Sequence, residues 1–350
     1  MSAPTLYARW LAELLPGPLP SEPGSTCESC AMCSPSGAPS DSCFSALTKC
    51  CTFFPDLPNF VVGRILDDAS AQGAEGRARL SARIEAGAEV TPLGVFAPPQ
   101  YSVQYKLAEP AFGRSTALRC PYFVEEHGAC SIWPHRISTC YTWYCKHTRG
   151  AVGLRFWTTL RRLLKAAERA VAQWCLLELN LEPTALTELV SWRENRALDA
   201  SALDGYGEHG QQGRLWRSWK GREQALYARC GELVSDLGWS DIRRAGGAAL
   251  QLLERVCVDT YNVHARGQVP ERLKVGRFSL LGIEEQVVRV ASYNAYDPIE
   301  LPRAVLALLH RFDGRETATV LGEILSADAI ELEPELVQLL VDFEILERCD

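Results

Sequence analysis

The sequence predicts a mainly α-helical protein of the α+β class, built around an irregular, cysteine-rich core that binds metal. Two observations lead to this prediction. Ten of the 14 cysteines lie between Cys27 and Cys145. After residue 150, several segments repeat apolar residues at three- and four-residue steps, which is typical of helices with one buried face. We expect domain boundaries after residues 183 and 268, which give a metal-binding segment 1–183, a helical segment 184–268 and a third segment 269–350.

Charge and hydropathy exclude several kinds of partner. The 350-residue chain has a net charge of −7, so no basic field favours nucleic acid or an anionic membrane. No apolar run approaches the roughly 18 residues that span a bilayer. Arg9 and Glu13 interrupt residues 1–20, which predict a short amphipathic helix and no signal peptide. We therefore expect a cytoplasmic protein, in which reduced thiols favour metal ligation over the alternative of disulfides.

The cysteine-rich half is predicted to be largely irregular. Residues 16–42 are rich in Pro, Gly and Ser, and loops of this kind let thiolates converge from several directions. Helical patterns are expected at 54–68 and 70–87, loop or strand at 91–105, and an irregular aromatic segment at 120–147.

Helices are predicted to follow this half of the chain. Apolar residues from Leu154 to Trp174 form one helical face. The rest of that helix is basic, and it is either solvated or a docking surface for an acidic partner. Residues 198–213 are a low-hydrophobicity linker, and helical patterns resume at 214–234 and 241–263. The basic side chains of the first helix are Arg155, Arg161, Arg162, Lys165 and Arg169.

The last segment combines strand and helix patterns. Residues 273–281 and 286–293 predict two strands joined by a turn. Helices are expected at 301–312, 317–328 and 333–346. A hairpin followed by three helices is the outline of a small winged-helix-like module.

The first cysteine cluster has C-x2-C-x2-C spacing at Cys27, Cys30 and Cys33. Two intervening residues let neighbouring sulfurs turn toward one metal. In ferredoxin-type clusters the four thiolate ligands come from this spacing together with a distant Cys-Pro pair. Cys120–Pro121 could be that distant pair in this sequence. Cys43 and the adjacent Cys50 and Cys51 lie downstream.

The second cluster is Cys120, Cys130, Cys140 and Cys145, with gaps of nine, nine and four residues. These gaps are wider than those of most zinc fingers, so the second cluster alone is only moderate evidence for a metal site. The two clusters together are strong evidence for one. Core packing does not explain so many thiols in one segment. We expect the two clusters to fold together around one or two metal centres.

Residues 130–145, CSIWPHRISTCYTWYC, place an Ile, an aromatic residue and an Arg between two cysteines, with a further aromatic before the last. This order resembles the YkgJ-type CxxCxxCC family of cysteine-cluster proteins, described as zinc- or iron-chelating. The resemblance covers roughly residues 27–147 and includes a Cys-Pro and a double cysteine. It implies a bound iron–sulfur cluster of the 4Fe–4S type, with zinc as the alternative. The matching residues are Cys50, Cys51, Cys120, Pro121, Cys130, Ile132, Trp133, Arg136, Cys140, Trp143 and Cys145.

The chain departs from the family pattern at several positions. Ile137 stands where the family has Pro, and Tyr141 stands where it has Arg. Sixteen residues separate Cys33 from Cys50, so the choice among the early cysteines, Cys43 included, is left open. The predicted metal ligands are Cys27, Cys30, Cys33, Cys50, Cys51, Cys120, Cys130, Cys140 and Cys145.

Arg136 and Trp133 are the predicted cofactor contacts. The Arg136 cation would offset the negative charge of a thiolate-bound cluster or pack over Trp133. His135 and His147 flank the second cluster. They either ligate metal and shuttle protons or, as we expect, orient the loop through hydrogen bonds. Asp56 is a base or, as expected here, a turn residue.

Asp313, Gly314 and Thr317 follow the predicted hairpin and its first helix. This arrangement resembles PqqD-type peptide-binding winged helices, in which the module presents a substrate peptide to an iron–sulfur partner enzyme. The resemblance implies that the C-terminal module recruits a peptide or protein.

Two functions are consistent with these patterns. The first is an iron–sulfur protein in redox or protein- and peptide-modification chemistry. The flagellin lysine N-methylases are similar cysteine-rich proteins, but this sequence has no glycine-rich strand–turn–helix for a methyl donor. The alternative is a zinc-stapled interaction module without catalysis. Whether the protein is an enzyme is left open.

Overall fold

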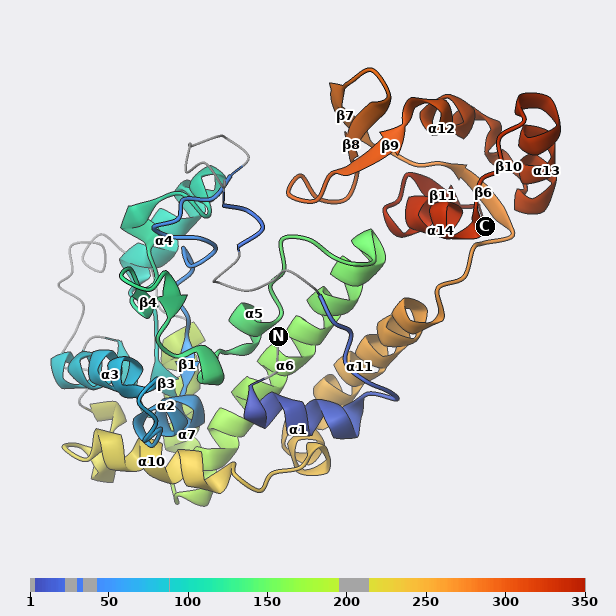
Figure 1. Ribbon diagram of the computed structural model, residues 1–350. Helices are drawn as coiled ribbons and strands as arrows, with labels where there is room; N and C mark the ends of the chain where they lie inside the picture. The colour runs from blue at the N-terminus through green and yellow to red at the C-terminus, as the bar shows by residue number, and fades with distance from the viewer. Residues whose placement is uncertain (1–3, 23–29, 34–42, 88, 195–213, 350) are drawn as a thin grey trace. The chain divides into compact units, whose positions relative to one another are not determined.

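The computed structural model describes residues 4–22, 30–33, 43–87, 89–194 and 214–349 (Figure 1). Contacts divide the chain into two compact units. The described residues of the first lie within 1–19, 26–143 and 161–254, and those of the second lie within 20–25, 144–160 and 255–350. Helices make up most of the regular structure, which confirms the prediction of a mainly α protein with some sheet. The boundaries expected from the sequence at 183 and 268 stay predictions.

The first unit is helical, with two small antiparallel sheets and short 3-10 turns. One sheet has the order β1-β3-β2, and the other is the β4–β5 hairpin. The helices α6 and α11 each contribute residues to both units. The elements are α1 (Thr5–Leu14), β1 (Leu57–Pro58), α2 (Asn59–Leu66), α3 (Ala74–Ala86), β2 (Val90–Thr91), β3 (Gly94–Val95), α4 (Pro99–Leu107), η1 (Glu109–Ala111), η2 (Thr116–Leu118), β4 (Phe123–Val124), β5 (Ala129–Cys130), η3 (Trp133–His135), α5 (Ser138–Tyr141), α6 (Gly150–Glu178), α7 (Pro183–Glu194), η4 (Arg217–Trp219), α10 (Glu223–Leu233) and α11 (Trp239–Arg266).

The helices α2 and α10 pack at close range because each carries a glycine at the crossing. A Cβ at Gly63 would lie 1.9 Å from a carbonyl oxygen of α10, and a Cβ at Gly231 would lie 3.1 Å from the backbone of Gly63. Only glycine fits such an approach. At the start of α2, the buried Asn59 amide donates to the carbonyls of Pro92 and Ala172 at 3.1 and 2.9 Å. These bonds fix α2 against the β2–β3 turn and α6.

The long helix α6 confirms the helical pattern expected between residues 154 and 174. Leu163, Leu164 and Ala167 on its apolar face are fully buried. The single helix expected at 214–234 is interrupted, since the chain forms η4 and then starts α10 at Glu223. Gly221 between them has a φ of +78°, which a continuous right-handed helix does not accommodate.

The second unit contains two three-stranded antiparallel sheets, with orders β10-β6-β11 and β7-β8-β9. Its core joins both sheets and three helices through Val288, Phe312 and Leu340, which are at most 1% exposed. The elements are β6 (Arg272–Val275), β7 (Ser279–Ile283), β8 (Val287–Ala291), β9 (Ile299–Pro302), α12 (Arg303–Leu308), η5 (Leu309–Arg311), β10 (Asp313–Glu316), α13 (Thr317–Asp328), α14 (Pro334–Asp342) and β11 (Leu346–Arg348).

The hairpin and the three helices expected near the C-terminus are present as β7–β8 and α12, α13 and α14. One expected strand, 273–281, is two strands in different sheets. The chain turns between them at Gly276, where a Cβ would lie 2.2 Å from the Glu344 carbonyl oxygen. The helix expected at 333–346 ends at Asp342, and β11 follows it. The description of this module as winged-helix-like stays a prediction.

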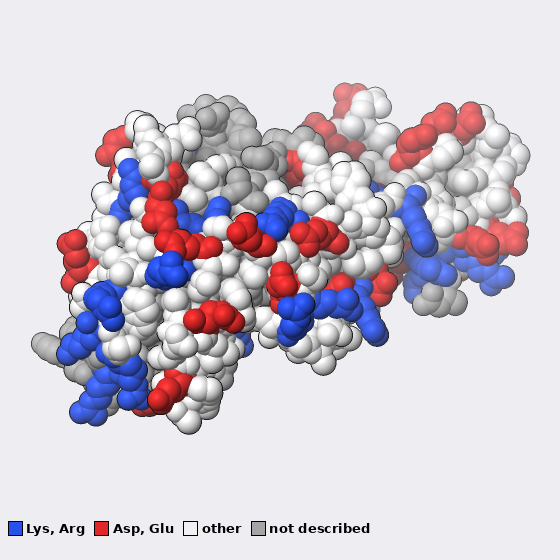
Figure 2. Space-filling model, turned by 90° about the horizontal axis from the view of Figure 1, so that it is seen from below, with Lys and Arg blue, Asp and Glu red and all other residues white. Residues whose placement is uncertain are grey.

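None of the helices that the structure describes is both long and apolar enough to cross a bilayer. On the face seen in Figure 2, basic side chains alternate with acidic ones. Arg79 forms an ion pair with Glu75 at 2.6 Å.

Candidate metal centre

Five cysteines of the first unit line one cavity of about 250 Å³. They come from the loop before β1, the loop after η2, strand β5 and the one-turn helix α5. Among the residues lining the cavity there is no His, Asp or Glu. Most of the remaining wall is aromatic or aliphatic, and two arginines complete it. The lining consists of Cys50, Cys51, Cys120, Cys130, Cys140, Phe53, Pro55, Tyr105, Phe112, Ile132, Trp133, Arg136, Ile137, Thr139, Trp143 and Arg161.

Backbone hydrogen bonds hold the double cysteine beside the Cys120 loop. The Cys120 amide donates to the Cys51 carbonyl at 2.8 Å. Ahead of the pair, the fully buried Thr48 hydroxyl donates to the Gly113 carbonyl at 2.7 Å. The Cys51 amide closes the turn by donating to the Thr48 carbonyl at 3.0 Å. These bonds bring together thiols that are about 70 residues apart in the chain.

The β4–β5 hairpin positions Cys130. In this hairpin Cys130 pairs with Phe123, and the next residue, Ser131, donates its amide to the Tyr122 carbonyl at 2.8 Å. On the outer side, the Arg79 guanidinium donates to the Phe123 carbonyl at 3.1 Å. The hairpin is thereby fixed to α3.

Cys140 lies on α5, whose start is held by a buried carboxylate. Glu168 on α6 accepts the Ser138 amide at 2.7 Å and the Ser138 hydroxyl at 2.8 Å. The Tyr7 hydroxyl of α1 also donates to this carboxylate. An acceptor at the first turn satisfies amides that a helix leaves unpaired. Glu168 therefore sets the position of the turn that carries Cys140.

Burial raises the pKa of three cavity thiols. It raises the pKa of Cys130 to about 11 and also raises the pKa values of Cys120 and Cys140. The pKa of Cys50 is lowered by a hydrogen bond from Cys51, and the same bond raises the pKa of Cys51. Such thiols keep their protons unless a cation compensates for the charge of the thiolates. A metal ion supplies that compensation.

Arg136 and Trp133 lie together on the cavity wall. The Arg136 side chain is 6% exposed, and its guanidinium carbon lies 3.4 Å from the centre of the Trp133 ring. Its Nε donates to the Trp133 carbonyl at 3.2 Å. Its Nη2 is buried and has no hydrogen-bond partner within the described ranges. Arg136 therefore packs on Trp133, as one of the two alternatives expected, and still presents an unpaired cationic donor.

The other predicted ligands do not line this cavity. Cys30 and Cys33 form a separate turn, in which the Cys33 amide donates to the Cys30 carbonyl at 3.1 Å. Burial raises the pKa of Cys33 to about 11. Cys145 belongs to the second unit, where its carbonyl accepts the Asn294 side-chain amide at 2.9 Å. Cys27 lies outside the described residues. Among the cysteines that the structure describes, none forms a disulfide.

The spacing of the thiols matters for which metal they suit. Within the described ranges, no three His, Cys, Asp or Glu side chains are positioned to bind a metal ion. A zinc ion draws four ligands onto one atom. In a four-iron cluster each cysteine binds a different iron, so the ligands stand farther apart. The five thiols line one cavity, and no three of them are drawn onto one point.

The flanking histidines lie in different units. His135 pairs with Asp68 at 3.0 Å in the first unit. In the second unit the buried His147 donates its amide to Asp297 at 2.9 Å, and its Nδ1 lies 3.3 Å from the Tyr293 hydroxyl. Neither histidine lines the cysteine cavity.

Arg161 lines the cavity, although the sequence pattern placed it only on the basic face of a helix. Its position in the helical repeat was an overlooked sign of partial burial, because Arg161 lies four residues after Trp157 and three before Leu164. Those steps put it at the margin of the apolar face. The aromatic wall formed by Phe53, Tyr105 and Phe112 had no such signal.

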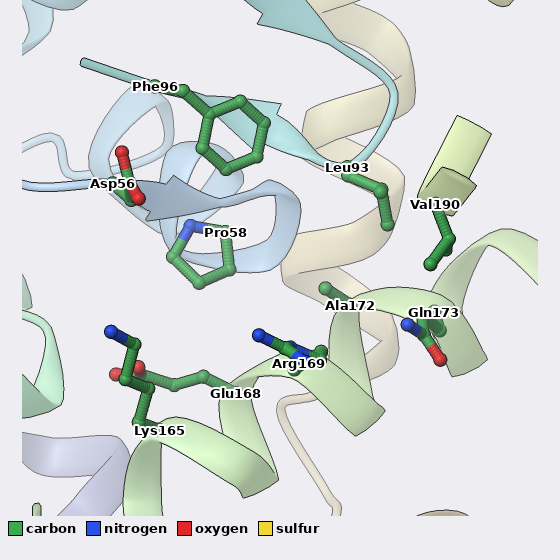
Figure 3. A pocket seen from close by; sticks show the side chains of 10 residues that line it. All are labelled: Asp56, Pro58, Leu93, Phe96, Lys165, Glu168, Arg169, Ala172, Gln173 and Val190. Atoms are coloured by element: carbon green, nitrogen blue, oxygen red, sulfur yellow. The ribbon is translucent and has the colours of Figure 1, made fainter. Parts of the chain in front are cut away.

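A second, smaller cavity of about 110 Å³ includes Glu168 in its lining (Figure 3). Asp56 and Pro58 form one wall, and α6 forms the facing wall with Lys165, Glu168 and Arg169. Asp56 accepts the Ala97 amide at 3.0 Å, so it joins two segments that are distant in the sequence, and the expected role in a local turn stays a prediction. The carboxylate of Glu168 is already bound by Tyr7 and Ser138. This cavity carries no cysteine.

Comparison with models of known families, with curated proteins and with solved structures found no match to this chain. The resemblances to the YkgJ-type family and to PqqD-type modules stay predictions that rest on the residues quoted above.

Proposed function

We propose that the cysteine cavity holds an iron–sulfur cluster and that the protein acts in redox or protein-modification chemistry. The observation that supports this most is the convergence of five thiols on one cavity. A 4Fe–4S cluster needs four cysteine ligands, and Cys50, Cys51, Cys120, Cys130 and Cys140 supply one more than that number.

The rest of the cavity wall fits a charged cluster. Aromatic side chains limit access of water, which is one of the means by which a protein tunes such a centre. The unpaired Nη2 of Arg136 provides a donor for a negatively charged sulfur. When bound, an iron–sulfur cluster supplies one-electron transfer. The residues of this chain would ligate it, exclude water from it and offset its charge.

A zinc-stapled interaction module is the second candidate. The observation that favours it is the lack of any His, Asp or Glu in the cavity lining, so no general base stands among the thiols. Zinc bound by four thiolates would order the surrounding loops without catalysing a reaction.

Anaerobic purification of the full chain, followed by iron, zinc and acid-labile sulfide analysis, tests the proposal. We expect iron and sulfide in similar amounts, together with broad visible absorption from thiolate-bound iron. The matched variants are Cys120→Ala, which removes a cavity thiol, and Cys175→Ala, which removes a buried thiol outside the cavity. Stoichiometric zinc without sulfide would refute the cluster and support the stapled module.

We further propose that the second unit recruits a peptide or protein. Strand β7 is an edge strand of its sheet, and it exposes apolar side chains at Leu280, Leu281 and Ile283. An exposed apolar edge strand is a template for pairing with another chain. Selection from a library of displayed random peptides should enrich extended apolar sequences with the parent. The variant Leu281→Lys should abolish that enrichment and leave the metal content unchanged, whereas equal enrichment by both proteins would refute this role of β7.

A further inference from the structure

Arg161 reaches the cysteine cavity from α6, a different element from those that carry the thiols. Its guanidinium carbon lies 5.4 Å from the centre of the Trp143 ring, and both side chains line the cavity. The Nε of Arg161 is buried and has no hydrogen-bond partner among the described residues. Burial lowers the pKa of Arg161, as expected for a cation without a nearby anion.

Two neighbours share this condition. The Nη2 of Arg136 and the indole Nε1 of Trp143 are also buried donors without a partner in the described part of the chain. Buried donors are rarely left unpaired, because losing water without gaining an acceptor costs free energy. Three such donors around one cavity therefore indicate an acceptor inside it.

The described residues of the chain do not supply that acceptor. No Asp or Glu lines the cavity, and neither arginine forms an ion pair within the described ranges. The buried carboxylate of Glu168 on α6 already accepts hydrogen bonds from Tyr7 and Ser138. The groups in the cavity able to carry negative charge are the five thiols, once a metal has displaced their protons.

We propose that Arg161, with Trp143 and Arg136, forms a donor wall that binds the negatively charged metal–thiolate centre of this cavity. The inference rests on the proposed metal site, and it assigns to Arg161 a role in holding the centre. Four thiolates outweigh the charge of a zinc ion or of an oxidised 4Fe–4S core, so the centre is anionic with either metal. Donors to its sulfurs stabilise the more negative, reduced state of a cluster and raise its reduction potential.

The test uses the full chain, purified without oxygen, as the parent and three variants. Arg161→Met removes the charge and the donors but keeps an unbranched side chain. Trp143→Phe removes a single N–H and keeps an aromatic ring, so it tests the wall if Arg161→Met folds poorly. Arg162→Met changes an exposed arginine on the same helix and is the matched control. The measurements are the rate of metal loss to a chelator, bipyridine for iron or EDTA for zinc, and the thermal midpoint of the metal-stripped protein.

We expect Arg161→Met to lose metal at least about tenfold faster than the parent, which is the usual effect of removing a partner of the ligands. Trp143→Phe should show a smaller acceleration, and Arg162→Met should match the parent. The metal-stripped Arg161→Met protein should be no less stable than the stripped parent, because an unpaired buried cation has been removed. With iron bound, its reduction potential should shift to more negative values.

Equal rates of metal loss for Arg161→Met and Arg162→Met would overturn the donor wall. Faster loss that is matched by an equal loss of stability in the stripped protein would also overturn it, since a purely structural arginine predicts that result. Iron and sulfide analysis of the parent separates this test from the proposed cluster. Zinc in the parent refutes the iron–sulfur cluster, and the donor wall is then tested by the rate of zinc loss to EDTA. A parent that retains no metal refutes both the cluster and the donor wall.

Discussion

Two sets of cysteines lie in different surroundings. Cys175, Cys230 and Cys257 lie on the helices α6, α10 and α11 and are fully buried. The thiol of Cys175 donates to the Cys230 carbonyl at 3.9 Å, and burial raises the pKa of Cys257 to about 12. These thiols behave as small apolar side chains in packed helices.

The cavity cysteines differ in their surroundings more than in their burial. Burial raises the pKa values of Cys120, Cys130 and Cys140 as well, but these thiols line an open cavity with arginine donors on its wall. The comparison teaches that burial alone does not distinguish a metal ligand from a packing residue. We propose that convergence on a shared cavity and nearby unpaired donors mark a metal ligand.

The largest expected effect comes from removing thiols of each set. The double variant Cys120→Ala/Cys140→Ala should lose nearly all bound metal, because three cavity thiols remain and a 4Fe–4S cluster needs four. Cys175→Ala should keep the metal content of the parent. Metal analysis of the purified proteins checks both. A double variant with full metal content would contradict the difference between the two cysteine sets. It would indicate that the early cysteines bind the metal.

Glu168 positions the turn that carries the cavity residue Cys140 and does not itself line the cavity. Glu168→Ala leaves the Ser138 amide and the Tyr7 hydroxyl without their shared acceptor, and such a loss costs about 2–3 kcal/mol. Urea unfolding measures this cost. Glu178→Ala, at an exposed position of the same helix, is the control and should change stability by less than about 0.5 kcal/mol. A Glu168→Ala protein as stable as the control would contradict the role of this carboxylate.

Thiol labelling gives a third test of the two sets. In the metal-stripped chain, a small alkylating reagent should modify the half-exposed Cys50 and Cys130 at least about tenfold faster than Cys175 and Cys230. Reaction of the helix thiols requires the packed helices to open. Mass spectrometry locates the labels. Bound metal should protect the cavity set alone, and equal protection of both sets would argue against a metal site in the cavity.

The smallest effect concerns Asp68, which supports the turn ahead of Arg136. The pKa of Asp68 is lowered to about 2 by hydrogen bonds from Ser70 and by His135. A carboxylate with a folded pKa below its unfolded value stabilises the protein above about pH 4, and this stabilisation is lost as the pH falls toward 2. The difference in unfolding free energy between the parent and Asp68→Asn should therefore shrink on acidification. A difference that stays constant with pH would show that the charge of Asp68 is irrelevant.

Local pattern in the sequence predicted the mainly α class and the long helix α6, but not α4, which lies largely within a segment expected to be loop or strand. The repeat from Leu154 to Trp174 marks α6 because its apolar residues face one core. The break at Gly221 and the split at Gly276 were missed, since a positive φ and a close backbone approach depend on neighbours distant in sequence.

The membership of the candidate site was only partly visible in the sequence. Spacing grouped Cys145 with Cys140, but the two residues belong to different units. The place of Arg161 at the margin of the apolar face of its helix was the one sign that it is not a fully solvated residue, and the cysteine spacing did not connect it with the cavity. Ligand convergence is set by tertiary hydrogen bonds, such as that between Cys120 and Cys51, and these leave no local pattern.

X-ray absorption of the metal in the full chain tests the central claim most directly. We expect an iron signal with sulfur neighbours and short iron–iron scattering, which is lost in Cys120→Ala/Cys140→Ala but kept in Cys175→Ala. A zinc signal with sulfur neighbours and no second metal would contradict the cluster. An iron–iron signal that survives the loss of both cavity thiols would contradict the assignment of these five cysteines.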